Sequence, residues 1–205
     1  MKPRPSSFFI LGMLRLGATS GYAIKKATDI SMRYFWPTSL AQVYPELGRL
    51  EEQGMVVRHD DSHGNRARAA YEVTEQGTEA MLEWLRGTEE EPLRLRDEGI
   101  LRLYFADALP PSEQIRLVRR LRERSGETGR ELREDVVPLG EILEQETGTR
   151  FPGMIARFGA DVFAFAEEWF AKLEAELNEE LAEAPEEPAK EPDGGQPPHS
   201  GASNP

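Results

Sequence analysis

Apolar residues recur at helical spacing in three short segments at the start of the chain. The first segment ends at Gly17 and carries the apolar positions Phe8, Phe9, Leu11, Leu14 and Leu16. The second follows Thr19-Ser20-Gly21, and the third begins at Thr38 or Ser39 and ends at Gly54. Hydroxyl residues favour helix N-caps, and glycine favours helix C-termini. The pattern therefore predicts three short helices, the first of them buried.

A different pattern follows the third predicted helix. Residues 55–59 and 70–74 are short apolar runs typical of strands, and the polar segment 60–69 between them is typical of a turn. Thr74 then caps a further helix, whose apolar positions are Met81, Leu82 and Leu85 beside Trp84. Three helices followed by a two-stranded hairpin with a basic tip predict a winged helix-turn-helix. We therefore expect a mainly α fold with one small β-hairpin wing.

The third predicted helix has two unlike faces. Val43, Leu47 and Leu50 form an apolar face. The opposite face carries the polar side chains Ser39, Gln42, Glu46 and Arg49. Tyr44 and Pro45 lie between the faces, although proline is costly inside a helix. In winged helix-turn-helix proteins the third helix enters the major groove of DNA, so one face packs inward while the other meets base edges.

This geometry indicates candidate DNA-binding residues. Gln42 can pair with adenine through both groups of its amide, and Ser39 can donate to or accept from several bases. Arg49 suits either a base or a phosphate. Arg66 and Arg68 on the wing suit phosphate, and they add affinity more than sequence choice. Lys25 and Lys26, on the exposed side of the second predicted helix, are candidate DNA contacts as well. The plainer interpretations are an ordinary solvated surface for Ser39, Gln42, Lys25 and Lys26, and loop solubility for the two wing arginines.

The distribution of charge changes what the net charge implies. The 205 residues include 25 Lys+Arg and 37 Asp+Glu, and the resulting net charge of −12 argues against nucleic acid as a partner. Residues 1–85 contain 10 basic and 10 acidic residues, so the whole acidic excess lies in residues 86–205, with 15 basic and 27 acidic. A neutral N-terminal domain can still present a local basic edge to DNA.

Composition divides the chain into four parts. We predict a winged helix-turn-helix domain in residues 1–86, a hinge in residues 87–92 and an antiparallel helical domain in residues 93–182. Residues 183–205 are rich in proline, glycine and acidic side chains, and we expect this tail to be disordered.

The last helix of the helical domain carries a broad apolar stripe. Its members are Val162, Phe163, Ala166, Trp169, Phe170, Leu173 and Leu177. Since no further domain of the chain is left to cover the stripe, we predict a homodimer through residues 93–182. A twofold dimer presents two recognition helices, so its target is expected to be a pseudo-palindrome with half-sites about 34 Å apart.

Other classes of function have little support. The chain has no cysteine, which excludes disulfides, thiolate zinc sites and cysteine nucleophiles, and we expect neither an enzyme nor a cofactor. His59 and His63 have a spacing that suits a metal site on a helix, whereas their segment has a strand pattern. No apolar run approaches the ~20 residues of a membrane span. The basic and apolar start of the chain is interpreted as a first helix of a cytoplasmic protein rather than a signal peptide.

Several motifs resemble one known family. Residues 9–85, about two-fifths of the chain, resemble the PadR family of bacterial transcriptional regulators in the stretches ILGMLRLGATSGYAIKK, QVYPELGRLEEQGMV and GNRARAAYEVTEQGTEAM. The most specific features are the pattern Tyr-Pro-x-Leu-x-x-Leu-Glu-x-x-Gly and the wing followed by Tyr-x-Val-Thr-x-x-Gly. The helical remainder is similar to the dimerising C-terminal domain of the longer family members.

The resemblance implies roles for further residues. Tyr44 matches the family's tyrosine on the recognition helix, which implies a contact near the DNA backbone, although its position also fits a core aromatic. Tyr22 matches the tyrosine that opens the second helix, and Pro45 the tolerated helix proline. The wing has Gly64-Asn65-Arg66-Ala67-Arg68-Ala69 where family members usually have Gly-x-Arg-Pro-Arg-Lys, so it is more flexible and has one charge fewer. Its candidate DNA contacts are Asn65, Arg66 and Arg68.

The expected function is a homodimeric, DNA-binding transcriptional repressor. Some family members respond to phenolic or drug-like compounds, which implies a small aromatic effector in an apolar cavity at the dimer interface. The candidate lining is Trp36, Phe165, Trp169 and Phe170, for which a plain core role is the alternative. The competing function is a winged-helix module that binds another protein through its acidic helices. The salt dependence of DNA binding discriminates the two.

Overall fold

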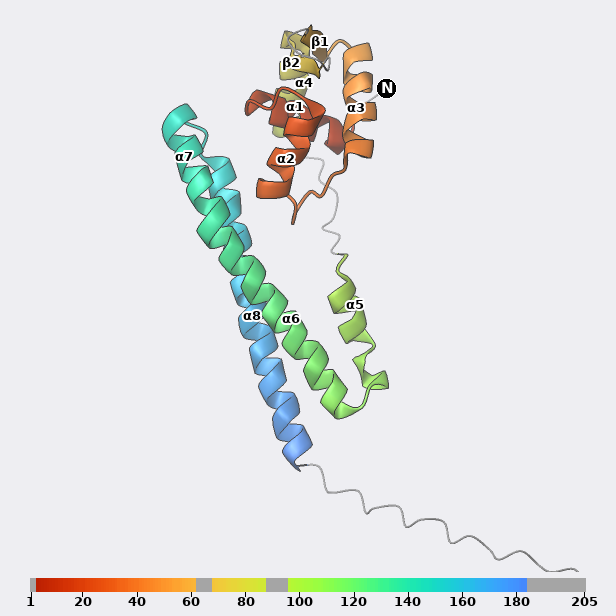
Figure 1. The fold of residues 1–205 in the computed structure, drawn as a ribbon, viewed down its shortest axis with the longest axis vertical. Helices are drawn as coiled ribbons and strands as arrows, with labels where there is room; N and C mark the ends of the chain where they lie inside the picture. Colours follow the sequence, from red (N-terminus) through yellow and green to blue (C-terminus); the bar gives the residue numbers. More distant parts are fainter. Residues whose placement is uncertain (1–2, 62–67, 88–95, 184–205) are drawn as a thin grey trace, which may run out of the picture.

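The computed structural model describes residues 3–61, 68–87 and 96–183, without the side chains of residues 60, 61 and 68. Its N-terminal part contains α1 (Pro5–Arg15), α2 (Gly21–Ser31), α3 (Leu40–Glu52), the antiparallel strands β1 (Val56–Asp61) and β2 (Arg68–Val73), and α4 (Glu75–Arg86). Three helices, a hairpin and a fourth helix form the winged helix-turn-helix of Figure 1. The prediction of a mainly α fold with a small hairpin is confirmed.

The helices of this part begin and end where the sequence indicates. Ser20 caps α2 by accepting a hydrogen bond from the Ala23 N–H at 3.2 Å, and Thr74 caps α4 by accepting one from the Gly77 N–H at 3.0 Å. Of the two cap candidates for α3, Ser39 occupies the position. Gly54 has a φ of 70°, which glycine adopts without strain and which turns the chain out of α3 into β1.

A single apolar core joins α1, α2, α3 and the base of the hairpin. Its fully buried side chains include Leu11, Ile24, Val43, Leu47 and Leu50. Trp84 of α4 stacks on Phe8, with 4.9 Å between ring centroids. Two residues assigned to the apolar faces are exposed instead, because Leu16 follows the last turn of α1 and Leu85 lies on the outer side of α4.

The C-terminal part is a long helical hairpin. It contains α5 (Glu98–Tyr104), the 3₁₀ turn η1 (Ala106–Ala108), α6 (Pro111–Glu131), the π-helical segment η2 (Leu132–Val136), α7 (Val137–Thr147) and α8 (Phe151–Glu183). α6, η2 and α7 follow one another without a break, and α8 runs back along them (Figure 1). Pro138 explains the π-helical segment, since proline lacks an N–H and its ring displaces the preceding turn. The predicted hinge beyond Gly87 and the tail from residue 184 lie outside the described residues.

The apolar stripe predicted on the last helix is divided between two sides of α8. Phe163, Ala166, Phe170, Leu173 and Leu177 pack against clusters that include α6 and η2 of the same chain. Val162 and Trp169 are exposed. The expectation that no part of the chain covers the stripe was therefore wrong for the larger share of its members. The buried Glu174 adds a polar link, because Arg119 Nε and Arg122 Nη1 each lie 2.7 Å from its carboxylate.

The two parts of the chain meet at the connection between α2 and α3. The Tyr34 hydroxyl donates to Glu131 Oε2 at 2.7 Å, and Arg33 pairs with the same carboxylate. The hydrogen bond from Tyr34 and then that from Arg33 hold the pKa of Glu131 below its usual value. Phe35 stacks on Phe158 of α8 with 6.0 Å between centroids. The segment directly before α3 is thus fixed to the helical hairpin.

Candidate nucleic-acid interface

The α3 helix buries one face completely and leaves the other uncovered. Val43, Leu47 and Leu50 are 0% exposed, whereas Ala41, Gln42, Tyr44 and Pro45 are exposed. Figure 1 shows α3 on the side of the N-terminal domain that faces away from α6 and α8. Within the described chain, the acidic helical hairpin formed by α6, α7 and α8 therefore does not cover the outer face of α3.

Glu46 does not belong to the free polar face on which the sequence pattern placed it. Its side chain is buried, accepts a hydrogen bond from the Ser7 hydroxyl of α1, and lies 2.8 Å from Arg49 Nη1. The pattern misplaced it because the partner, Ser7, is 39 residues away in sequence. Glu46 therefore anchors α3 to α1, and part of the Arg49 guanidinium is occupied by this carboxylate.

Ser39 and Gln42 form the N-terminal cap of α3. Gln42 Oε1 accepts from the Ser39 N–H at 3.0 Å and from the Ser39 hydroxyl at 3.1 Å. The backbone N–H of Ser39 requires an acceptor, so this contact fixes which way the amide of Gln42 is turned. The Gln42 NH₂ group then faces away from the cap. Gln42 presents donors to a ligand, rather than the donor and acceptor that bidentate pairing with adenine requires.

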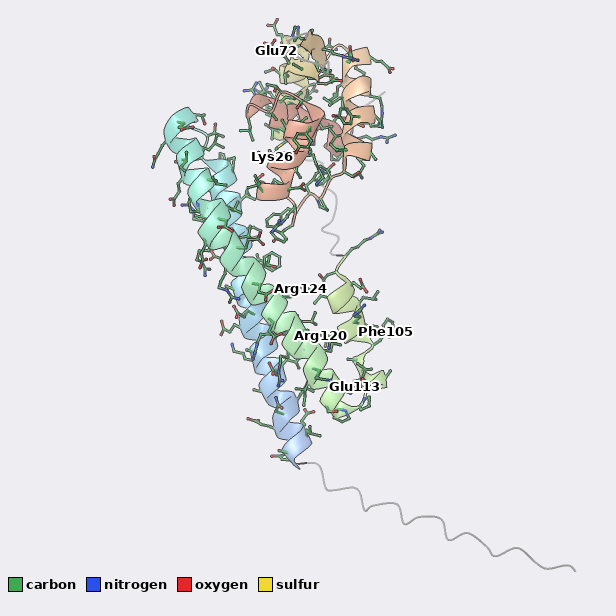
Figure 2. All side chains as sticks on the ribbon, in the orientation of Figure 1. Lys26, Glu72, Phe105, Glu113, Arg120 and Arg124 are labelled. Atoms are coloured by element: carbon green, nitrogen blue, oxygen red, sulfur yellow. The ribbon has the colours of Figure 1, made fainter. Side chains whose placement is uncertain are left out.

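Two tyrosines and a lysine lie near the start of α2. Tyr44 is 50% exposed, so it is not a core aromatic, and Tyr22 is also exposed. The ring of Tyr44 lies against Gly21, where an added Cβ would be 2.8 Å from Tyr44 Cε1. Glycine at this position lets the ring lie on the first turn of α2. Lys25 is paired with Asp29, and the exposed Lys26 next to it is labelled in Figure 2.

The wing is described only at its base. Residue 68 lies in β2 opposite residue 61 of β1, and Asn65, Arg66 and the side chain of Arg68 lie outside the described residues. His59 Nε2 lies 3.4 Å from Glu72 Oε2 across the two strands. His63 lies outside the described residues. Among described side chains, no group of three or more His, Cys, Asp or Glu is placed to hold a metal ion.

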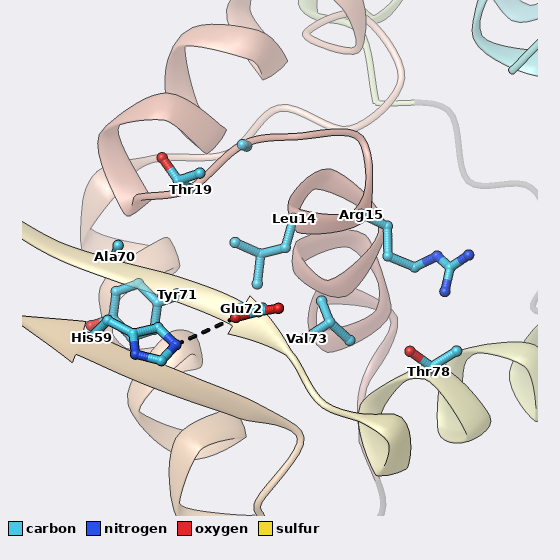
Figure 3. Close-up of a pocket in the computed structure, with 10 residues that line it drawn as sticks. Leu14, Arg15, Thr19, His59, Ala70, Tyr71, Glu72, Val73 and Thr78 are labelled. Atoms are coloured by element: carbon cyan, nitrogen blue, oxygen red, sulfur yellow. Dashed lines mark ion pairs between the residues drawn. The ribbon is translucent and has the colours of Figure 1, made fainter. Parts of the chain in front are cut away.

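The proposed aromatic cavity is not assembled within one described chain. Phe170 is buried in the α6–α8 core beside Trp169, Phe165 is exposed, and Trp36 lies against Phe9 of α1. A hollow of about 410 Å³ lies elsewhere, where α1 and the following turn meet the wing and the start of α4 (Figure 3). In this hollow Arg15 lies on the α1 side and the His59–Glu72 pair on the strands. No described helix is long and apolar enough to cross a membrane.

Replacing Pro45 with Ala is expected to stabilise the protein by about 1–2 kcal/mol. Proline is about 3 kcal/mol less favourable than alanine inside a helix, and the restriction it places on the unfolded chain offsets about 1 kcal/mol of this. Pro45 is exposed on α3, so its ring fills no core space. Thermal unfolding followed by circular dichroism measures the change. An unfolding temperature below that of the wild-type protein would show that the ring stabilises the folded chain.

Comparison with known proteins gives two matching families along the chain. Residues 10–83 match the transcriptional regulator PadR-like family, and residues 95–178 match the family described as virulence activator alpha C-term. The negative transcriptional regulator PadR of Bacillus subtilis (strain 168) is 31% identical over 111 residues. That alignment covers 54% of this chain and 61% of the relative, which is less than two thirds of the relative's length.

Solved structures share the fold over most of the chain. Bacillus subtilis PadR in complex with operator DNA superposes with a TM-score of 0.76 at 22% identity, covering 85% of this chain and 99% of that one. The same protein in complex with p-coumaric acid superposes with a TM-score of 0.65, also at 22% identity and with the same coverage. Both matched families, the curated relative and the shared fold agree with one another. Residues 10–83 of the chain form a domain of the PadR-like family of transcriptional regulators, and the chain shares its fold with the solved PadR structures.

Proposed function

We propose that this protein is a cytoplasmic, homodimeric transcriptional repressor that places α3 in the major groove of a pseudo-palindromic operator. The observation that carries the proposal is the asymmetry of α3: its inner face is fully buried, while its outer face is bare and points away from the acidic hairpin. A helix of this kind, in the third position of a winged helix-turn-helix, has the geometry of a recognition helix.

The contacts to the DNA backbone are assigned to residues around α3. Tyr22 and Tyr44 present exposed hydroxyl-bearing rings at the start of α2, and Lys25 follows one turn later. Arg49 contributes the part of its guanidinium that Glu46 leaves free. On the wing, Asn65, Arg66 and Arg68 supply further phosphate contacts. Ser39 and Gln42 hold the first turn of α3 at the groove, with the Gln42 NH₂ group directed to a base acceptor.

The proposed dimer forms through a second apolar surface of α8. We define the α8 strip as the exposed side chains Phe151, Ile155, Phe158, Val162, Phe165 and Trp169. They follow one another at alternating intervals of four and three residues, which is the spacing of a coiled-coil seam. This strip lies on a different side of α8 from the residues that pack on α6. A second copy of the chain is the occupant that gives the regulator two recognition helices.

We assign release from the operator to a change in the contact between the N-terminal domain and the helical hairpin. Arg33, Tyr34 and Phe35 connect the start of α3 to Glu131 and Phe158, so a shift of the hairpin moves the recognition helix. The structure of the relative with p-coumaric acid supports a small aromatic effector. An effector acts by binding one dimer geometry more tightly than the other.

DNA binding is tested by selecting bound sequences from random duplexes and then titrating salt. A dimer that makes about six phosphate contacts is expected to lose about 1,000-fold in affinity between 50 and 200 mM salt. Arg66→Ala removes one proposed phosphate contact from each protomer, so it is expected to weaken all sequences alike and to reduce the salt slope by about two contacts. Failure to select any sequence, together with flat salt dependence, contradicts the proposal and favours a winged-helix module that binds another protein.

A further inference from the structure

The hollow between α1, the wing and the start of α4 has the size and lining of a small-molecule site. Its volume of about 410 Å³ lies within the range of about 300–1,000 Å³ that is typical of such sites. Its floor is apolar, since Leu14 is buried and Ala18 and Val73 are half-buried. None of the described residues that line it belongs to α3, so the hollow is separate from the proposed recognition helix.

Two charged side chains of opposite sign lie on different sides of this floor. Figure 3 shows Arg15, the last residue of α1, on one side of Val73 and Glu72 of β2 on the other. Among the described residues, the Arg15 guanidinium has no hydrogen-bond or ion-pair partner. The Glu72 carboxylate faces His59 at 3.4 Å, which is longer than the about 2.7–2.9 Å of a charge-assisted hydrogen bond. Both charged groups therefore retain the capacity to bind a ligand.

The opposite signs of these two side chains limit the class of ligand. Glu72 repels a simple anion that pairs with Arg15, and Arg15 repels a simple cation that pairs with Glu72. A molecule with a carboxylate at one end and an amine at the other satisfies both side chains, and the apolar floor between them suits an apolar middle. We propose that the hollow binds a small zwitterion of this kind, an ω-amino acid, with its carboxylate on Arg15 and its ammonium group on Glu72.

A ligand in this position connects α1 to the wing. The Tyr71 N–H of β2 donates to the Thr19 carbonyl oxygen of the turn after α1 at 2.8 Å, and both residues line the hollow. A zwitterion that bridges Arg15 and Glu72 adds a second link between the same two segments. It binds most tightly to the wing position in which both charges are within reach, and so favours that position. This consequence for the wing rests on the proposed DNA-binding function, whereas the site itself does not.

The site is tested by titrating the ¹⁵N-labelled protein with 6-aminohexanoate at low ionic strength, where exposed charges are least screened. The amide signals of Thr19 and Tyr71 are expected to shift and to saturate in the millimolar range. Hexanoate and hexylamine each keep the apolar segment and one charge. Each is expected to bind about fivefold more weakly or less, because one exposed ion pair contributes about 1 kcal/mol.

Two pairs of matched variants test the two charges separately. Arg15→Gln and Glu72→Gln are each expected to weaken 6-aminohexanoate about fivefold. Arg86→Gln and Glu79→Gln remove the same charges from exposed positions of α4 outside the lining, and they are expected to bind as the wild-type protein does. The double variant Arg15→Glu/Glu72→Arg is expected to retain binding within a few-fold, because the probe can turn end to end.

The outcomes separate the site from the function proposed for the whole protein. The site is overturned if 6-aminohexanoate does not bind, if hexanoate or hexylamine binds equally well, or if neither Arg15→Gln nor Glu72→Gln weakens binding. Fluorescence anisotropy with the selected duplex is expected to show a change in DNA affinity when 6-aminohexanoate is added. Saturable amide shifts without that change support the site and overturn its link to the wing. If the protein selects no DNA sequence, the proposed function fails while the amide titration still decides the site.

Discussion

Phe165→Asp is expected to convert the proposed dimer to a monomer and to reduce operator affinity at least about 100-fold. Phe165 is 69% exposed in the single chain and occupies the α8 strip between Val162 and Trp169. A carboxylate placed in an apolar interface without a partner costs several kcal/mol, which weakens the proposed interface in both protomers. Loss of the second recognition helix then removes the gain from binding two half-sites at once, about 10²–10⁴-fold. Light scattering measures the mass, and fluorescence anisotropy measures the DNA affinity.

The control for this variant is Phe165→Leu, which keeps an apolar side chain at the same site. It is expected to remain dimeric and to bind the operator within a few-fold of the wild-type protein. Because Phe165 lies outside the packed α6–α8 cluster, neither variant is expected to change helix content. A dimeric Phe165→Asp protein would show that the second copy docks on another surface, such as the side of α5 that exposes Leu101 and Tyr104.

Local patterns were sufficient to predict the architecture. The helix caps at Ser20 and Thr74, the glycine stop at Gly54 and the short apolar runs of the strands are all short-range signals. Each signal depends on residues a few positions apart, so each can be recognised from the sequence alone. The order of elements then determines the winged helix-turn-helix. The family resemblance, drawn from the Tyr44-Pro45 motif and the wing, agrees with the matched families.

The candidate interface was less predictable because long-range pairing decides which polar groups are free. Glu46 has the spacing of a surface residue, but Ser7 and Arg49 draw it into the core. The joint formed by Tyr34 and Glu131 spans 97 residues and has no sequence signature. The residues that face outward on α3 could have been identified from the sequence. Taking the buried leucines as the inner direction places Ala41, Pro45 and Gly48 opposite them, whereas polarity alone indicates Ser39, Gln42 and Arg49 as the outer face.

The same division applies to the last helix. Its apolar residues form two surfaces, and sequence spacing alone merges them into one wide stripe. Packing on α6 uses Phe163, Phe170 and the leucines that follow. Within the described part of the chain, the α8 strip then remains exposed, and Phe158 at one end of it stacks on Phe35. The proposed dimer therefore rests on a set of side chains that shares only Val162 and Trp169 with the stripe that first suggested it.

Gly77→Ala is expected to destabilise the protein by about 2–3 kcal/mol, with a fall in unfolding temperature of about 5–10 °C. Gly77 lies in the first turn of α4 at the base of the wing, where an added Cβ would be 2.2 Å from the Met55 carbonyl oxygen and 3.0 Å from Val73 Cγ1. The nearest obstacle is backbone, so it cannot turn aside as a flexible side chain does. Relief requires α4 to move away from the residues that lead into β1 and end β2.

The sign of the change in unfolding temperature distinguishes a steric clash at Gly77 from an effect of helix propensity. Alanine is intrinsically favoured over glycine in a helix by about 0.5–1 kcal/mol, and Gly12→Ala, with open space around it, shows that gain alone. Gly77→Ala and Gly12→Ala are therefore expected to shift the unfolding temperature in opposite directions. Since the displaced segment holds the wing beside α3, operator affinity is also expected to fall, although Gly77 is not one of the proposed DNA contacts. A stabilised Gly77→Ala protein would mean that α4 does not press on Met55, and that the wing is not held at this point.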